Sequence, residues 1–146
     1  MPDTAAGSLA ICVAALLVFG AYIDCTQRRF PNELACVSAA LAALWVCFHD
    51  SVAALGWHAL SSLALCGLLL LIEVLYRRFF RKQGMGMGDI KALFSMGLLS
   101  FAAAVSSLII GLLLLAVYGA SRHERALPAL PFIVPVFLVL WFVFGL

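Results

Sequence analysis

Charged residues are scarce in this sequence: Asp, Glu, Lys and Arg make up 11% of its 146 residues, while 66% are hydrophobic. Soluble domains are roughly half apolar and about a quarter charged, so the composition excludes an ordinary soluble domain. Long, nearly uncharged stretches are typical of membrane spans. Such blocks fill most of the chain, at Leu9–Ile23, Leu34–Phe48, Val52–Tyr76, Ala92–Ala120 and Ala126–Leu146. We predict an all-α, polytopic membrane protein.

Paired cysteines and metal-ligand clusters are also missing from the sequence. The five cysteines are scattered and form no CxxC pair, and the three histidines are dispersed. A disulfide framework or a zinc site needs closer spacing than this. We therefore expect no metal and no cofactor, with the cysteines packing as small apolar residues.

Basic residues are absent from the connection between the second and third blocks, "HDS". The nine lysines and arginines gather in three places: Arg28 and Arg29; Arg77, Arg78, Arg81, Lys82 and Lys91; Arg122 and Arg125. Because basic loops stay on the cytoplasmic side of bacterial membranes, we expect all three to face the cytoplasm. The predicted location is the bacterial inner (plasma) membrane, with the lipid bilayer and not nucleic acid as partner.

The fourth block decides the number of spans. As one helix, Asp89 to Gly119 would be roughly 46 Å long at about 1.5 Å per residue, against about 30 Å of hydrocarbon. A single span would also carry the basic "SRHER" outside, so we predict two short helices that turn near "LLSFAAAVSS". The expectation is about six transmembrane helices with both termini outside, forming one domain over residues 1–146.

Two of the seven acidic residues, Asp24 and Asp89, are harder than the others to assign to a purely structural role. Glu73 precedes Arg77 by four residues, as in a helical ion pair, and Glu33 falls in a first helical turn, where the dipole favours a negative charge. Asp24 ends the first span, where the dipole opposes it. Asp89 begins the fourth, where it could simply be an N-cap.

As a pair, Asp24 and Asp89 favour a functional interpretation. The predicted topology puts both at the same depth, and ionisable residues at membrane depth usually face an interior cavity and mark a function. Two carboxylates that share a proton can divide acid and base work. Gly86 and Gly88 would permit the turn and let a substrate backbone approach Asp89.

These residues resemble a known family. "GMGD" (Gly86–Asp89) matches the GxGD signature of intramembrane aspartyl proteases, and "MGMGDIKAL" is similar to the second-aspartate motif of type IV prepilin peptidases. "DCTQRRFPNEL", from Asp24 to Leu34, resembles their first-aspartate motif. The resemblance implies that Asp24 and Asp89 are the catalytic pair of an aspartic endopeptidase, which removes the short basic leader of prepilins at the cytoplasmic face.

The chain also departs from the larger prepilin peptidases. It lacks their N-terminal region with paired cysteines, so we expect no N-methyltransferase activity. The compact form is similar to peptidases of tight-adherence (Flp) pilus systems, which implies Flp-type pilins and pseudopilins as substrates. Where the family often has Pro-Phe/Tyr-Gly, this chain has Pro131, Phe132 and Ile133.

Several neighbours of the aspartates are candidate supporting residues. Lys91 could bind a substrate carboxylate, bias the protonation of the pair, or extend to the lipid headgroups. Arg28 and Arg29 fit topology anchors better than ligands. Pro31 and Asn32 are expected to start the second helix and so to aim Asp24.

Other functions fit the same residues. A small proton- or ion-coupled transporter could use both aspartates as titrating carriers, although the outer halves of the spans offer few ionisable groups for a pathway. In a structural subunit of a secretion machine, the aspartates would cap helices. A presenilin-like protease with another substrate shares GxGD.

Overall fold

The computed structural model describes residues 2–27, 30–80, 86–122 and 128–144, and the described chain is helical. Six α-helices follow one another: α1 Pro2–Gln27, α2 Asn32–His49, α3 Val52–Phe80, α4 Met87–Leu99, α5 Phe101–Arg122 and α6 Leu130–Phe144. The prediction of an all-α, polytopic membrane protein is confirmed. Of the six transmembrane helices expected, four of the described helices are long and apolar enough to cross a membrane, and the outside position of the termini stays a prediction.

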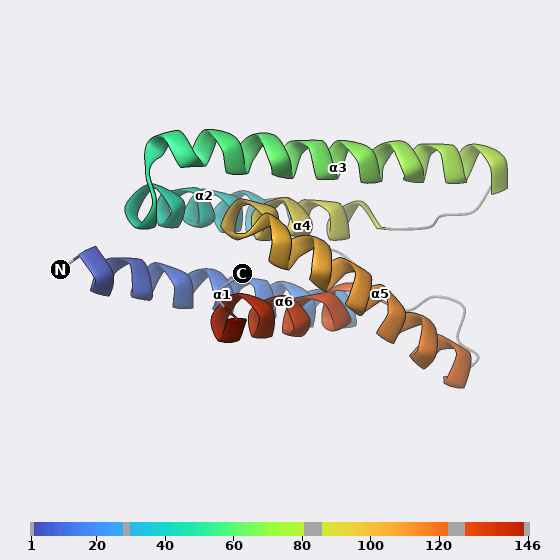
Figure 1. Ribbon diagram of the computed structural model, residues 1–146. Coiled ribbons are helices and arrows are strands. Elements are labelled where there is room, and N and C mark those ends of the chain that lie inside the picture. Colours follow the sequence, from blue (N-terminus) through green and yellow to red (C-terminus); the bar gives the residue numbers. More distant parts are fainter. Residues whose placement is uncertain (1, 28–29, 81–85, 123–127, 145–146) are drawn as a thin grey trace.

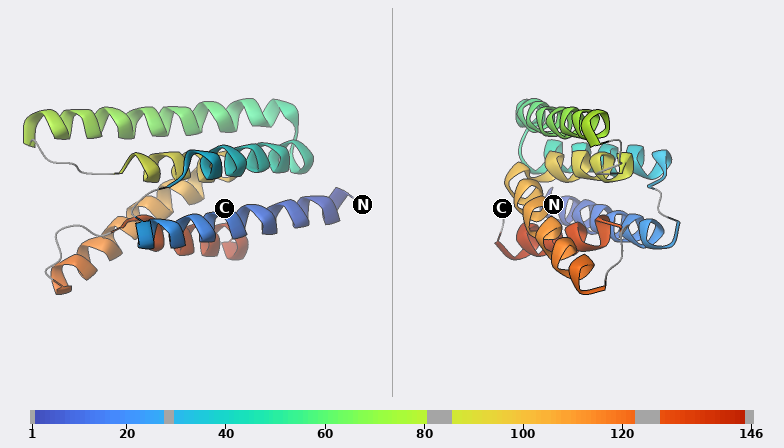
Figure 2. Two further views of the ribbon diagram at one scale, coloured as in Figure 1. Left: turned by 180° about the vertical axis from the view of Figure 1, so that it is seen from behind. Right: turned by 90° about the vertical axis from the view of Figure 1, so that its right-hand side faces the viewer.

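The helices form three layers that α5 crosses (Figures 1 and 2). α3 makes one outer layer, α2 and α4 lie in the middle, and α1 and α6 make the other outer layer. α4 packs against α2, α3 and α5, while α1 packs against α2 and α6. α4 is therefore the helix that the others enclose, and most of its residues are buried.

Successive helices run in opposite directions, so their connections alternate between the two ends of the bundle (Figure 1). The N-terminus and the α2–α3 turn lie at one end, together with the α4–α5 junction. The helix ends that flank the three basic connections lie together at the other. This is the alternation that the charge pattern required.

Four helices are long and apolar enough to cross a membrane: α1, α2, α3 and α5. The predicted division of the fourth block is confirmed, since α4 ends at Leu99 and α5 begins at Phe101. Both of these helices were expected to be short. That holds for α4, which has 13 residues, but not for α5, which has 22. α6 has 15 residues and contains Pro135.

A single extended residue, Ser100, separates α4 from α5. Its backbone angles are φ −157° and ψ 116°, and its hydroxyl accepts a hydrogen bond from the Ala103 N–H at 3.3 Å. Serine is a favoured N-cap because its side chain satisfies a free N–H of the first turn. Ser51 caps α3 in the same way, at 3.1 Å from the Ala54 nitrogen. Serine caps thus place the breaks between apolar helices.

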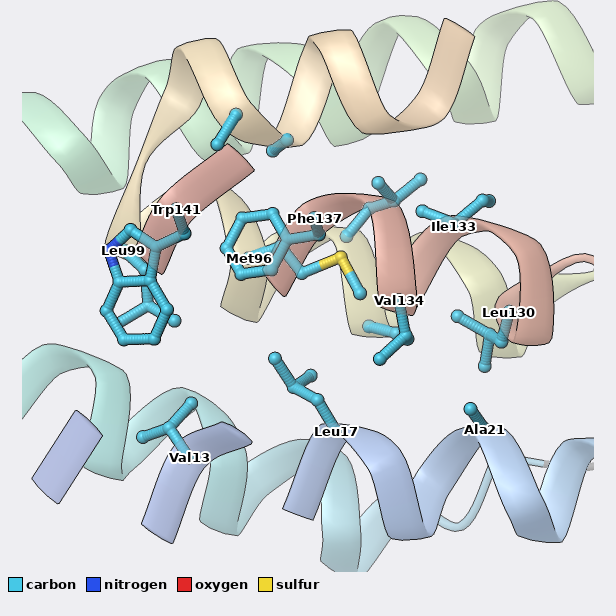
Figure 3. Close-up of a cluster of buried hydrophobic side chains, with 14 of the residues drawn as sticks. Val13, Leu17, Ala21, Met96, Leu99, Leu130, Ile133, Val134, Phe137 and Trp141 are labelled. Atoms are coloured by element: carbon cyan, nitrogen blue, oxygen red, sulfur yellow. The ribbon is translucent and has the colours of Figure 1, made fainter. Parts of the chain in front are cut away.

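The core lies between α1, α4 and α6 (Figure 3). Val13, Leu17 and Ala21 recur at helical spacing along α1 and point toward α6. The facing side of α6 is a buried stripe that contains Leu130, Ile133, Val134, Phe137 and Trp141. Both stripes continue to the end of the bundle at which α1 ends and α6 begins.

A buried hydrogen bond joins α2 to α4. The hydroxyls of Ser38 and Ser95 lie 2.9 Å apart, and both residues are fully buried. Ser38 Oγ also donates to the Ala35 carbonyl at 3.1 Å, so Ser95 Oγ is the donor between the two serines. Small hydroxyl residues at helix contacts allow close packing as well as an interhelical bond.

This arrangement predicts an unequal response to alanine. Ser38→Ala leaves the Ser95 hydroxyl buried without its partner and should lower stability by about 1–3 kcal/mol. Ser95→Ala should cost less, because Ser38 keeps its bond to Ala35. The double variant should be more stable than Ser38→Ala alone. Thermal unfolding in detergent measures the order, with exposed Ser121→Ala as control; a larger loss for Ser95→Ala would contradict the assigned donor.

Candidate active site

Asp24 faces the protein interior at the end of α1. It lies three residues after Ala21, which places it on the stripe of Val13, Leu17 and Ala21, and only 8% of its surface is exposed. Its carboxylate accepts a hydrogen bond from the Leu130 backbone N–H. The Oδ2 atom is buried and has no hydrogen-bond partner at standard distances among the described residues. A buried acceptor without a partner is costly, so Oδ2 is suited to a water or substrate donor.

The start of α6 explains why Leu130 is available to Asp24. Helix starts leave backbone N–H groups without intrahelical partners. The N–H groups of Phe132 and Ile133 both turn back to the Ala129 carbonyl, at 3.0 and 3.2 Å, and Pro131 has no N–H. The Leu130 N–H remains, and the positive end of the helix dipole lies behind it. This end of α6 forms one side of the Asp24 environment.

Asp89 lies in the first turn of α4, three residues after the N-cap Gly86. The expectation that Asp89 might itself be the N-cap is therefore wrong. Its Oδ2 instead accepts a hydrogen bond from the Gly86 N–H at 3.2 Å, while its own N–H donates to the Gly86 carbonyl at 3.1 Å. Asp89 is 7% exposed and heads the stripe that continues through Leu93 and Met96.

The structure brings Asp24 and Asp89 together. α1 ends and α4 begins at the same end of the bundle (Figure 1), and the two carboxylates are close enough for their charges to interact. α3 and α5 extend past this level in Figures 1 and 2, so the pair is recessed from the ends of those helices. Two buried carboxylates in one another's field can share a proton and act as acid and base.

The candidate supporting residues have varied surroundings. Pro31 is the N-cap of α2, with Asn32 as its first residue, as expected from the sequence. The Lys91 ammonium donates to Asn32 Oδ1 at 2.5 Å, so it ties the start of α4 to the start of α2. This contact with Asn32 is not among the three roles considered for Lys91 from the sequence. Arg28 and Arg29 lie outside the described residues.

Glu73 and Glu33 have the structural roles expected of them. Glu73 Oε1 accepts from Arg77 Nε at 2.6 Å, which confirms the predicted helical ion pair. Glu33 lies in the first turn of α2, as expected. Over the described ranges, no three His, Cys, Asp or Glu side chains gather in a way that could hold a metal ion.

Sequence reasoning missed two parts of this site. The Leu130 N–H could not be foreseen, because the docking of α6 on α1 depends on packing between distant segments. Phe30 lies in the first-aspartate motif and is buried, yet an aromatic beside a basic pair is easily taken for an interfacial residue. Its position directly before Pro31, at the start of α2, was the available signal.

Comparison with known proteins is consistent with this geometry. A sequence model of the type IV leader peptidase family matches residues 11–146, which include both aspartates and all the described helices apart from the start of α1. No curated protein and no solved structure gives a match to the chain. The match covers nearly the whole sequence and confirms the resemblance to prepilin peptidases, and the chain therefore belongs to the type IV leader peptidase family.

Proposed function

We propose that this membrane peptidase is an aspartic endopeptidase in which Asp24 and Asp89 are the catalytic pair. The observation that carries the proposal is the burial of both carboxylates at one end of the bundle, within reach of each other's charge. Burying two acidic groups together is expensive, and apart from one backbone N–H each, no described group offsets that cost. A catalytic role accounts for this arrangement.

The chemistry follows from one proton shared by two carboxyl groups. The ionised carboxylate takes a proton from a water molecule while the water oxygen attacks the scissile carbonyl carbon. The protonated carboxyl donates its proton to the carbonyl oxygen. The carboxyl that took the water proton then donates it to the leaving nitrogen, and the C–N bond of the tetrahedral diol breaks. The other carboxylate takes a proton from a diol hydroxyl, whose oxygen becomes the carbonyl of the new acid, so the pair returns to its starting state. Asp24 Oδ2, buried and unpaired, is a suitable acceptor for a hydrogen bond from this water.

The backbone donors keep the pair in position during the reaction. The Leu130 N–H binds Asp24, and the Gly86 N–H binds Asp89. Both donors are backbone N–H groups, which cannot rotate away as a side chain can, so each carboxylate keeps a fixed orientation. Lys91 and Asn32 add a link between α4 and α2, which fits a role in shaping the site.

The proposed substrates are prepilins, specifically Flp-type pilins and pseudopilins with short basic leaders. A prepilin carries its own apolar N-terminal helix, so it can diffuse within the bilayer to the enzyme. The cleavage point then lies at the cytoplasmic face of the inner membrane, beside the recessed pair.

Asparagine substitution tests the pair directly. Asp24→Asn and Asp89→Asn keep the side-chain volume and one acceptor oxygen but cannot exchange the proton, so each should lower prepilin cleavage by about 10³-fold or more. Purified variants are incubated in detergent with a prepilin, and the mature pilin is quantified. Asp50→Asn, at the opposite end of α2, is the matched control. Normal cleavage by either site variant would refute the proposal.

The absence of methyl transfer has a separate test. Mature pilin released by the purified protein should keep an unmodified N-terminal amine when S-adenosylmethionine is supplied, because the chain lacks the paired-cysteine region associated with that activity. Intact-mass spectrometry of the pilin, with and without the methyl donor, makes the measurement. A methylated product would disprove this part of the proposal.

The side of cleavage predicts the labelling of single cysteines. In a chain with its five native cysteines replaced, Gln27→Cys reports the end of α1 next to Asp24, and Ser51→Cys reports the α2–α3 turn. A membrane-impermeant maleimide should label Gln27→Cys only in inverted membrane vesicles and Ser51→Cys only in intact spheroplasts. The reverse pattern would place the aspartates at the outer face.

A further inference from the structure

Phe30 lies between the two helices that carry the aspartates. It is buried at 6% exposure and belongs to the same apolar core as Leu17 and Met96. α1 packs mainly on α2 and α6, whereas α4 packs mainly on α2, α3 and α5. The backbones of α1 and α4 therefore approach each other at few places, and side chains between them set their separation near the aspartates.

Two glycines make room for Phe30. A Cβ built on Gly20 of α1 would overlap the ring edge of Phe30 at Cε2, and a Cβ on Gly88 of α4 would lie 2.7 Å from Phe30 Cβ and 3.2 Å from its backbone nitrogen. Gly20 is one helical turn before Asp24, on the same face. Gly88 immediately precedes Asp89. The ring of Phe30 therefore touches one aspartate-bearing helix, and its backbone touches the other.

We propose that Phe30 is a positioning residue that fixes the separation of Asp24 and Asp89 by packing against Gly20 and Gly88. The proposal rests on the catalytic role proposed for that pair. It assigns each glycine a steric reason: at each one a helix backbone meets Phe30 with no room for a side chain. Proton exchange between two carboxylates and a substrate depends steeply on distance, and a misplacement of about 1 Å can cost about 10²-fold in rate.

The two contacts predict different responses to a compensating change. Gly20→Ala and Gly88→Ala should each lower kcat by about 10²-fold. KM should change little in Gly20→Ala, because Gly20 is packed against Phe30 and has no assigned role in substrate binding. Phe30→Leu removes Cε2 and should restore most of the activity lost in Gly20→Ala. It should not restore Gly88→Ala, because leucine keeps the Cβ and backbone nitrogen that the new methyl group meets.

Gly7→Ala is the matched control, since Gly7 lies on the same helix as Gly20 and a Cβ there would meet no atom within 4 Å. It should leave kcat, KM and thermal unfolding unchanged. Thermal unfolding of every variant in detergent identifies misfolded protein. Equal rescue of both glycine variants by Phe30→Leu, or full activity of Gly20→Ala, would overturn the proposal.

A measurement without catalysis separates this inference from the proposed function. Asp24→Cys and Asp89→Cys are combined in a chain without native cysteines and treated with bifunctional thiol reagents of graded length. The shortest reagents should cross-link the pair fastest with Phe30 present, and Phe30→Ala should slow them and favour longer ones. An unchanged length profile would refute the spacer role even if Asp24→Asn is inactive. A changed profile supports it even if that variant still cleaves prepilin.

Discussion

The burial of two carboxylates beside each other is the constraint on which the rest of this structure depends. In an apolar helix bundle, each charge loses its hydration, and each lies in the field of the other. Backbone N–H groups at the starts of two helices donate hydrogen bonds to these carboxylates. Leu130 of α6 donates to Asp24, and Gly86 at the start of α4 donates to Asp89. These donors carry the positive end of a helix dipole and need no additional buried side chain.

That solution determines where helices must begin. α4 and α6 are the short helices, with 13 and 15 residues, and both start near the aspartates, at a level that α3 and α5 pass (Figure 1). If α4 or α6 began earlier in the chain, the free N–H groups of its first turn would lie beyond the carboxylates and could not bind them. The four helices long enough to cross a membrane include α1, which carries Asp24, so the site joins the end of one long helix to the starts of two short ones.

Much of this architecture could be predicted because it depends on hydrophobicity and charge along the chain. The length of the fourth block and the basic "SRHER" after it required a break, and Ser100 provides it. Contacts between distant segments carry no such periodic signal. The pairing of Lys91 with Asn32 and the bond between Ser38 and Ser95 each join residues more than fifty positions apart. The first-turn position of Asp89 depended on a helix start two residues earlier than expected.

The departure at Ile133 has a structural explanation in the packing of α6 on α5. The family often has glycine at this position, and the isoleucine that this chain has instead is fully buried. Its partner on α5 is Gly111, where an added Cβ would lie 2.9 Å from the Ile133 Cα and 3.1 Å from its nitrogen. The close approach of the two helices is thus made possible by a glycine on α5. The isoleucine side chain fills the core, while its N–H still closes the first turn onto Ala129. Because that turn leaves the Leu130 N–H free for Asp24, the substitution preserves this side of the site.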